Sequence, residues 1–138
     1  MAVIDTATGA LVGSPVIVDG HRAGHLQLSA DGARAFQTTQ TFDSGTRTWT
    51  TTVAVVAPSS GVLVNAPIVV DGSFRVHVDD LLHPRALVFN ADGTRAFITT
   101  QNLGSGIDAT IPEKSTVAVI DTATGSLVGA PITIDGLY

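Results

Sequence analysis

The sequence predicts an all-β protein that is built from repeated units of short antiparallel strands. One block of residues, at 2–20, returns nearly unchanged at 118–136 and more loosely at 54–72. A second block, at 28–40, recurs at 89–101. Repeats of this length are typical of architectures in which each unit is one small group of secondary-structure elements. No segment keeps the apolar spacing of a helix, so we predict no significant helix.

The turn residues place four short strands in each unit. Runs rich in Val, Ile, Thr and Phe are separated by two kinds of turn, Ala-Asp-Gly-x-Arg and Asp-Thr-Ala-Thr-Gly. Asp-Gly favours a tight hairpin, and in the second turn the Asp accepts backbone hydrogen bonds while Gly allows a positive φ. The first turn is found at 30–34 and 91–95, and the second at 5–9 and 121–125. The middle copy of the second turn has Ala57 in place of the Asp and keeps Gly61, so we expect it to survive with less rigidity.

The repeat spacing divides the chain into a half unit and two full units of one structural body. We assign residues 1–20 to the half unit, 21–72 to the first full unit and 73–138 to the second. The second full unit is longer because residues are inserted after Gly72, at 73–82, and after Gln101. Apolar and polar side chains alternate in the first insertion. This indicates either an added strand that contacts a ligand or partner, or a loop that only caps the repeat.

Composition excludes several classes of protein. With 44% hydrophobic and 14% charged residues, the chain should fold, yet no apolar run is long enough for a membrane helix, so we expect no membrane insertion. A net charge of -5 with scattered basic residues argues against nucleic acid. The absence of cysteine excludes disulfides and thiolate zinc sites. Residues 1–6 lack the pattern of a signal peptide, so either export is not encoded here or an N-terminal part is missing.

Three stretches carry a resemblance to a known family. They are Leu28-Ser29-Ala30-Asp31-Gly32, Arg95-Ala96-Phe97-Ile98-Thr99-Thr100 and Val117-Ala118-Val119-Ile120-Asp121-Thr122-Ala123-Thr124. In these stretches the chain resembles the bacterial YVTN-type β-propeller repeats, over nearly its whole length apart from the two insertions. It departs from the family pattern in having Phe36 and Phe97 where Tyr is usual, and Thr-Thr-Gln where Thr-Asn is common.

The resemblance implies a partial β-propeller of about 2.5 four-stranded antiparallel blades. The Asp-Gly hairpin would join the two inner strands of a blade, and the Asp-Thr-Ala-Thr-Gly hairpin the two outer ones. Since a propeller closes with four to eight blades, we expect this chain either to belong with the remaining blades of a longer protein or to self-associate. The resemblance also implies an extracellular or cell-surface location.

Histidines in the connections between blades are the best candidates for a site. His21, His25, His77 and His83 all precede predicted inner strands, and they would rim one face of a propeller together with Arg22, Asp79, Asp80 and Arg85. Their spacing matches no metal-binding or catalytic motif, so we predict a binding role and no catalytic residue, metal or cofactor. The competing interpretation is that exposed loops simply collect polar residues. A further stretch, Thr46 to Thr52, is predicted to be a solvent-facing strand, with ligand stacking on Trp49 as the alternative.

Two functional hypotheses follow, one of binding and one of catalysis. The first is a non-enzymatic propeller segment of a secreted or cell-surface bacterial protein, which presents loops for protein or glycan binding. The alternative is part of a lactonase-like or quinoprotein-like propeller enzyme with a His-lined channel mouth. Four histidines gathered on one face with a carboxylate among them would favour the enzyme. A duller possibility is a truncated reading frame with no function of its own.

Overall fold

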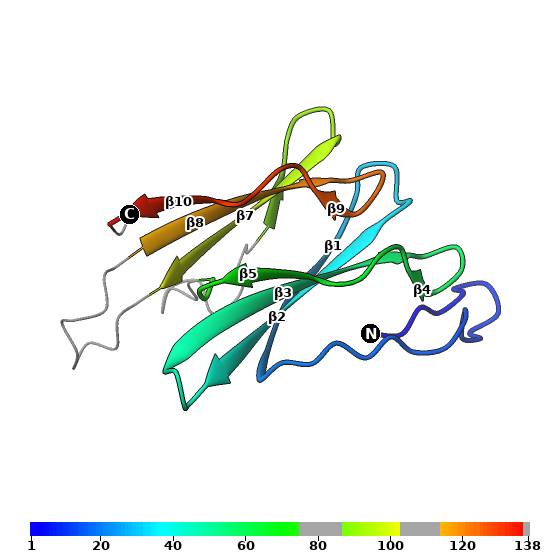
Figure 1. Cartoon of the computed structure of the whole chain (residues 1–138). Coiled ribbons are helices and arrows are strands. Elements are labelled where there is room, and N and C mark those ends of the chain that lie inside the picture. The colour runs from blue at the N-terminus through cyan, green and yellow to red at the C-terminus, as the bar shows by residue number, and fades with distance from the viewer. Residues whose placement is uncertain (75–86, 103–113, 137–138) are drawn as a thin grey trace, which may run out of the picture.

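The described part of the chain is all-β. The structure is a computed structural model, and it describes residues 1–74, 87–102 and 114–136. These residues form two antiparallel sheets and contain no helix (Figure 1). The first sheet comprises β1 (Arg22–Leu28), β2 (Ala35–Asp43), β3 (Thr48–Ala57), β4 (Val62–Leu63) and β5 (Ile68–Asp71). The second comprises β6 (Leu87–Phe89), β7 (Arg95–Asn102), β8 (Lys114–Asp121), β9 (Ser126–Leu127) and β10 (Ile132–Asp135). The predicted all-β class is thereby confirmed. Among these residues, no helix has the length and hydrophobicity that a bilayer-spanning helix needs.

The outermost strand of each sheet differs from the prediction, because it is divided in two. β4 and β5 both pair with β3, and β9 and β10 both pair with β8. Pro67 and Pro131 lie in the interruptions. Each interruption covers four residues, 64–67 and 128–131, and ends at the proline, which has no N–H to donate to the neighbouring strand. Pairing resumes at the next residue. Each sheet therefore has five strands in four positions.

The predicted hairpins are confirmed. In the first sheet the chain turns at Gly32, whose N–H donates to the Ser29 carbonyl, and Gly93 makes the equivalent bond to Asn90 in the second sheet. Both glycines have a positive φ, of 68° and 71°. The weaker middle copy of the other turn also survives, since the Gly61 N–H donates to the Ala57 carbonyl.

Residues 1–20 fold as a short hairpin that repeats the outer pair of each sheet. Ile4 and Leu11 form an isolated antiparallel bridge. The equivalent pairs are Val56 with Leu63 in the first sheet and Ile120 with Leu127 in the second. The side chains of Val16 and Val18 are half-buried, whereas Ile17 between them is exposed. Residues 16–18 of this N-terminal segment thus show the side-chain alternation of a strand.

The core lies between the two sheets. The contacts join β3 and β5 of the first sheet to β7 and β8 of the second. Phe36 and Phe89 meet across the interface edge to face, with ring centroids 5.3 Å apart. The buried apolar side chains of this core are Phe36, Val53, Val55, Ile68 and Val70 from the first sheet and Leu87, Ala96, Ile98, Ala118 and Ile120 from the second. Each sheet therefore buries one face against its neighbour.

The same hydrogen bonds join each unit to the next. Thr39 of β2 donates its hydroxyl to the Asp19 carbonyl, at 2.8 Å, and the equivalent Thr100 of β7 donates to the Asp71 carbonyl. One residue further along, the backbone N–H groups of His21 and Ser73 donate to the carbonyls of Gln40 and Gln101 respectively. The repeated Thr-Thr-Gln triplet therefore makes the junction between units.

The predicted solvent-facing Thr46 to Thr52 stretch is corrected at one position. Thr51 of β3 is fully buried, and its hydroxyl donates to the Gly72 carbonyl at 2.7 Å. β5 lies beside this stretch and pairs with it at Thr51 and its neighbours. A buried Thr can donate its hydroxyl to a backbone carbonyl, as Thr51 does. A Thr-rich composition therefore does not distinguish a buried strand from an exposed one.

The junction hydrogen bond of Thr100 can be tested with a matched pair of variants. Thr100→Val removes the fully buried hydroxyl that donates to the Asp71 carbonyl, so we expect the free energy of unfolding to fall by about 1–2 kcal/mol. Thr99→Val, at the exposed neighbouring position, should change it by no more than about 0.5 kcal/mol. Urea unfolding followed by fluorescence measures both. Equal effects of the two substitutions would contradict the assignment.

Candidate functional site

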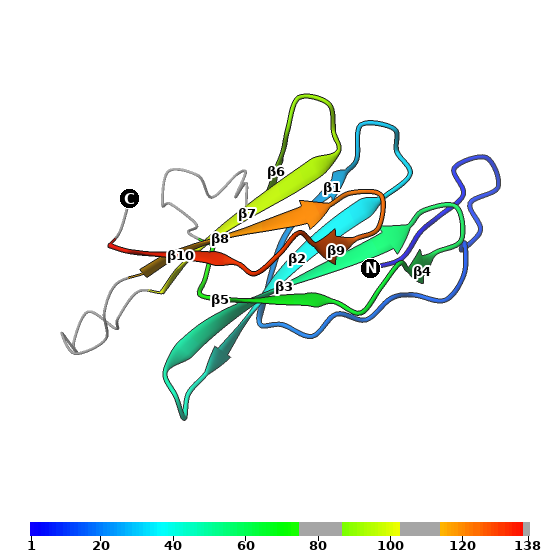
Figure 2. The same cartoon turned by 45° about the horizontal axis from the view of Figure 1, so that its top comes forward.

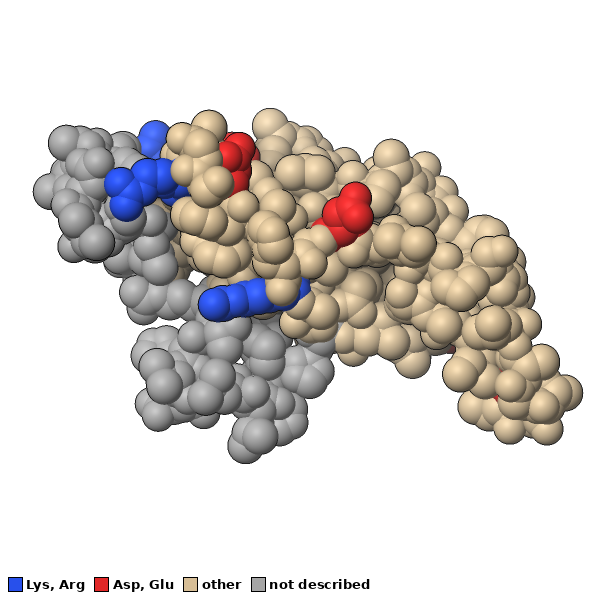
Figure 3. Space-filling model, turned by 90° about the horizontal axis from the view of Figure 1, so that it is seen from below, with Lys and Arg blue, Asp and Glu red and all other residues tan. Residues whose placement is uncertain are grey.

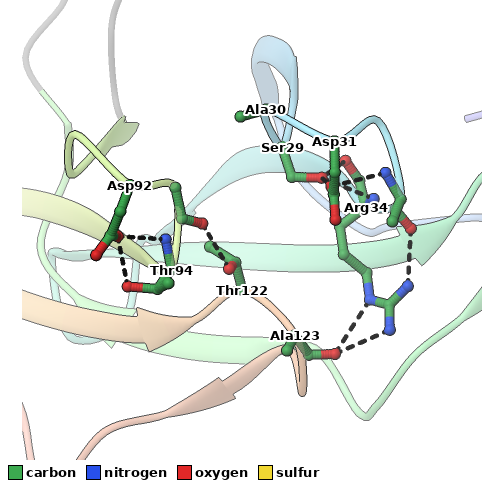
Figure 4. A pocket seen from close by; sticks show the side chains of 10 residues that line it. Ser29, Ala30, Asp31, Arg34, Asp92, Thr94, Thr122 and Ala123 are labelled. Carbon is green, nitrogen blue, oxygen red and sulfur yellow. Dashed lines mark hydrogen bonds between the residues drawn. The ribbon is translucent and has the colours of Figure 1, made fainter.

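A cleft lies between the two Asp-Gly hairpins, where the first sheet meets the second. Both hairpins stand at the same end of the sheets (Figure 2). The cleft has a volume of about 310 Å³. Its walls are the hairpin residues Ser29, Ala30, Asp31, Ala33, Arg34, Asp92, Gly93 and Thr94, closed by Thr122 and Ala123 from the turn after β8 (Figure 4). The volume is at the lower end of that of small-molecule sites.

Two exposed carboxylates, one from each hairpin, are held rigidly at this cleft. Asp31 Oδ1 accepts hydrogen bonds from the Ser29 hydroxyl at 2.6 Å and the Ala33 N–H at 3.0 Å. Asp92 Oδ1 accepts from both the N–H and the hydroxyl of Thr94, at 2.9 and 2.6 Å. Each hairpin thus fixes its carboxylate through local bonds between side chain and turn.

The same bonds keep both carboxyl groups ionised. The Ser29 hydroxyl lowers the pKa of Asp31 below its ordinary value, with the Ala33 N–H adding to the effect. The Thr94 hydroxyl lowers the pKa of Asp92 in the same way, with its N–H as the second cause. Donors that bond to the charged form stabilise that form. At neutral pH the cleft therefore carries two negative charges.

Arg34 links the two sheets at the edge of the cleft. Its Nε and Nη2 donate to the Ala123 carbonyl of the neighbouring unit, at 3.2 and 2.9 Å (Figure 4). The equivalent Arg95 instead forms an ion pair with Asp121 of its own sheet, at 2.6 Å. The first sheet has Ala57 at the position of Asp121, so Arg34 has no such carboxylate and reaches across. Because Ala57 offers no carboxylate, the Arg34 guanidinium bonds to the neighbouring unit instead.

Thr122 fixes the second wall of the cleft. Its N–H donates to the Thr94 carbonyl at 3.1 Å, and its hydroxyl donates to the Gly93 carbonyl at 2.7 Å. These bonds hold the turn after β8 against the Asp-Gly hairpin of the same sheet. The cleft is accordingly preformed, and it offers fixed carboxylate acceptors and one guanidinium.

The predicted site residues lie elsewhere, as far as the structure describes them. His21 accepts a hydrogen bond at Nδ1 from the Phe42 N–H, at 3.1 Å. Arg22 begins β1, and its guanidinium lies 5.6 Å from the centroid of Trp49, which also packs against Phe42. His25 lies within β1 and not in a connection. His77, Asp79, Asp80, His83 and Arg85 lie outside the described residues.

Sequence reasoning therefore pointed to the opposite end of β1 from the cleft. His21 and Arg22 stand at its start, and the cleft begins at Ser29, directly after its end. The signal for the cleft was present in the repeated Ala-Asp-Gly-x-Arg motif, which was interpreted only as a turn. Trp49, the alternative stacking residue, has one ring contact with Arg22 and another with Phe42.

Metal-ligating residues and similarity to known proteins also bear on this site. Within residues 1–74, 87–102 and 114–136, no three His, Cys, Asp or Glu side chains gather closely enough to hold a metal ion. No protein-family model, curated protein or solved structure matches the chain. Its class is therefore defined by the structure alone, as an all-β protein of two packed antiparallel sheets.

The hydrogen bond from Ser29 to Asp31 predicts a specific pH dependence. Because the pKa of Asp31 is lowered in the folded state, its contribution to stability is complete above the ordinary pKa of about 4 and is lost as the pH falls through the folded value. Ser29→Ala raises the folded pKa toward the ordinary value. The loss of unfolding free energy below about pH 4 should then be smaller than in the unmodified protein.

Urea unfolding between acidic and neutral pH measures this difference. Asp31→Asn, which keeps the Oδ1 acceptor but does not titrate, should flatten the same part of the profile. Ser59→Ala, at an exposed turn position, is the control and should leave the profile unchanged. A profile of Ser29→Ala that follows the unmodified protein throughout would refute the assignment.

Proposed function

We propose that the chain is a non-enzymatic segment of a β-propeller in a secreted or cell-surface bacterial protein, and that its inter-blade cleft binds a protein or glycan ligand. The observation that carries this proposal is the preformed cleft between successive Asp-Gly hairpins, with an ionised carboxylate on each wall. The secreted location follows from the sequence resemblance alone.

Two features support the propeller part of the proposal. The N-terminal segment, the first sheet and the second sheet succeed one another through the same junction, made by Thr39 to Asp19 and again by Thr100 to Asp71. The sheets also pack by faces, and the strand order β1-β2-β3-β4 is that of a blade traversed from inside to outside. Successive antiparallel sheets joined by a constant contact are what a propeller requires.

The carboxylates favour a ligand that donates hydrogen bonds. The turn hydrogen bonds from Ser29, Ala33 and Thr94 to these carboxylates all use Oδ1, so they leave the Oδ2 side of Asp31 and Asp92 for other donors. Sugar hydroxyls and ammonium groups are the natural donors to such oxygens. The chain's net charge of -5 further favours a cationic or neutral ligand over an anionic one. On the face seen in Figure 3, the described residues show only a few charged side chains, of both signs, among mostly uncharged surface.

We expect a chitosan tetramer, which carries both ammonium groups and hydroxyls, to shift the backbone amide signals of residues 29–34 and 90–94 in an NMR titration. The N-acetylated tetramer tests the uncharged donors without the ammonium groups, and a lysine-rich peptide tests ammonium groups without sugar hydroxyls. The double variant Asp31→Asn, Asp92→Asn keeps the turn acceptors but removes both charges. It should weaken binding at least tenfold, because charge-assisted hydrogen bonds are the stronger ones.

The matched control is Asp43→Asn. Asp43 makes the same kind of turn, accepting from the Gly45 and Thr46 N–H groups, but it lies in the hairpin between β2 and β3 at the far end of the sheet. This variant should bind like the unmodified protein. If it loses affinity as much as the double variant, net charge and not the cleft is responsible. If none of the three probes shifts the cleft signals, the proposed binding role is wrong.

A further inference from the structure

We propose that this chain associates head to tail with a second copy of itself. The N-terminal segment of one copy would cover β8 and β10 of the other. The inference concerns a different surface from the cleft and does not depend on ligand binding. It rests on two exposed apolar faces, whose equivalents elsewhere in the chain are packed against each other.

The first exposed face lies on the second sheet. Ile68 and Val70 of β5 are buried against the second sheet, with 8% and 1% of their surface exposed. Their equivalents on β10, Ile132 and Ile134, are 59% and 40% exposed. Val117 and Val119 of β8, equivalent to the buried Val53 and Val55, are only half-buried. The repeat thus places the same apolar face on the second sheet, where no described residues cover it.

The second exposed face lies on the N-terminal segment. Ala118 and Ile120 are fully buried in the core, and Leu127 packs against it. Their equivalents in the segment are Ala2, Ile4 and Leu11. Ile4 and Leu11 are each 57% exposed. The segment therefore exposes to solvent the residues whose equivalents in the second sheet pack against the first sheet.

The interface inside the chain is the template for the contact between copies. There, Ala118 and Ile120 of one unit meet Val53, Val55, Ile68 and Val70 of the unit before it. Between copies, Ala2, Ile4 and Leu11 would meet Val117, Val119, Ile132 and Ile134. Each position has an apolar residue of similar size, so the docked pair would bury the same type of surface.

The glycines give independent support for these two faces. Gly61 and Gly13 lie in contact between the N-terminal segment and the first sheet, since a Cβ on Gly61 would meet the Val12 carbonyl and one on Gly13 would meet that of Ser60. The equivalent glycines at the two outer faces, Gly9 and Gly129, have open space there. A docked second copy would bring Gly9 of one chain and Gly129 of the other into the same kind of close approach.

A second copy fits this pattern because one chain carries both complementary faces. Such a pair of different surfaces makes a head-to-tail contact, which continues into a ring or an open series. The N-terminal segment has only the outer strands, so it covers β8 and β10 but not Phe97 on β7, which is 37% exposed. The contact therefore depends on the two outer strands.

Blocking each face separately tests the arrangement. Ile4→Glu places a charge on the N-terminal face and Ile134→Lys places one on β10. Both side chains are exposed in the single chain, so both variants should fold, as circular dichroism can verify. In sedimentation velocity we expect the unmodified chain to form dimers and larger species as its concentration is raised through the micromolar range. Each variant alone should stay monomeric.

The decisive sample is an equimolar mixture of the two variants. One intact face remains on each, so the mixture should form a dimer that grows no further. Ile17→Glu is the control. The equivalent residue of the second sheet, Thr133, is exposed even though that sheet packs against the first. Position 17 should therefore lie outside the contact between copies, and this variant should associate normally. A monomeric unmodified chain would overturn the proposal and leave the β10 face to further repeats of a longer protein. Loss of association with Ile134→Lys but not with Ile4→Glu would overturn it in favour of a symmetric contact between β10 faces.

Discussion

Packing of sheet on sheet is the interaction on which the rest of this structure depends. Each sheet is apolar on both faces, so a unit alone would leave hydrophobic side chains exposed on both sides. Phe36 and Val53 are buried only because the second sheet lies over them. Ala54 and Val56, on the other face of the same sheet, are fully buried on the side of the N-terminal segment. The repeat is therefore stabilised by stacking one sheet on the next.

The polar residues then act at the two ends of the stack. At one end the chain crosses from unit to unit close to the next sheet: a Cβ on Gly72 would approach the Thr100 hydroxyl and the Gln101 carbonyl to 3.0 Å. This close crossing, fixed by the Thr100 hydroxyl, sets the spacing between neighbouring sheets. At the other end the same spacing separates the Asp-Gly hairpins and leaves the cleft between them.

Features that depend on neighbouring residues were predictable from the sequence, and those that depend on contacts between units were not. The hairpins at Gly32 and Gly93 follow from local turn chemistry, and the structure has them. The loss of Asp at position 57 was also visible, but its consequence, the bond from Arg34 to Ala123, needs the position of the next sheet. Burial of Thr51 likewise depends on β5, which is distant in sequence.

Whether the two sheets share one core is tested most directly by a destabilising substitution in the second sheet. Trp49, the single tryptophan, reports on the first sheet, whereas Ile98 belongs to the second and is fully buried at the interface. Ile98→Ala should lower the urea midpoint that Trp49 fluorescence records and, to the same extent, the midpoint followed by the amide signal of Ala118, because one core unfolds as a unit. A Trp49 transition that stays in place while that of Ala118 shifts would contradict a shared core.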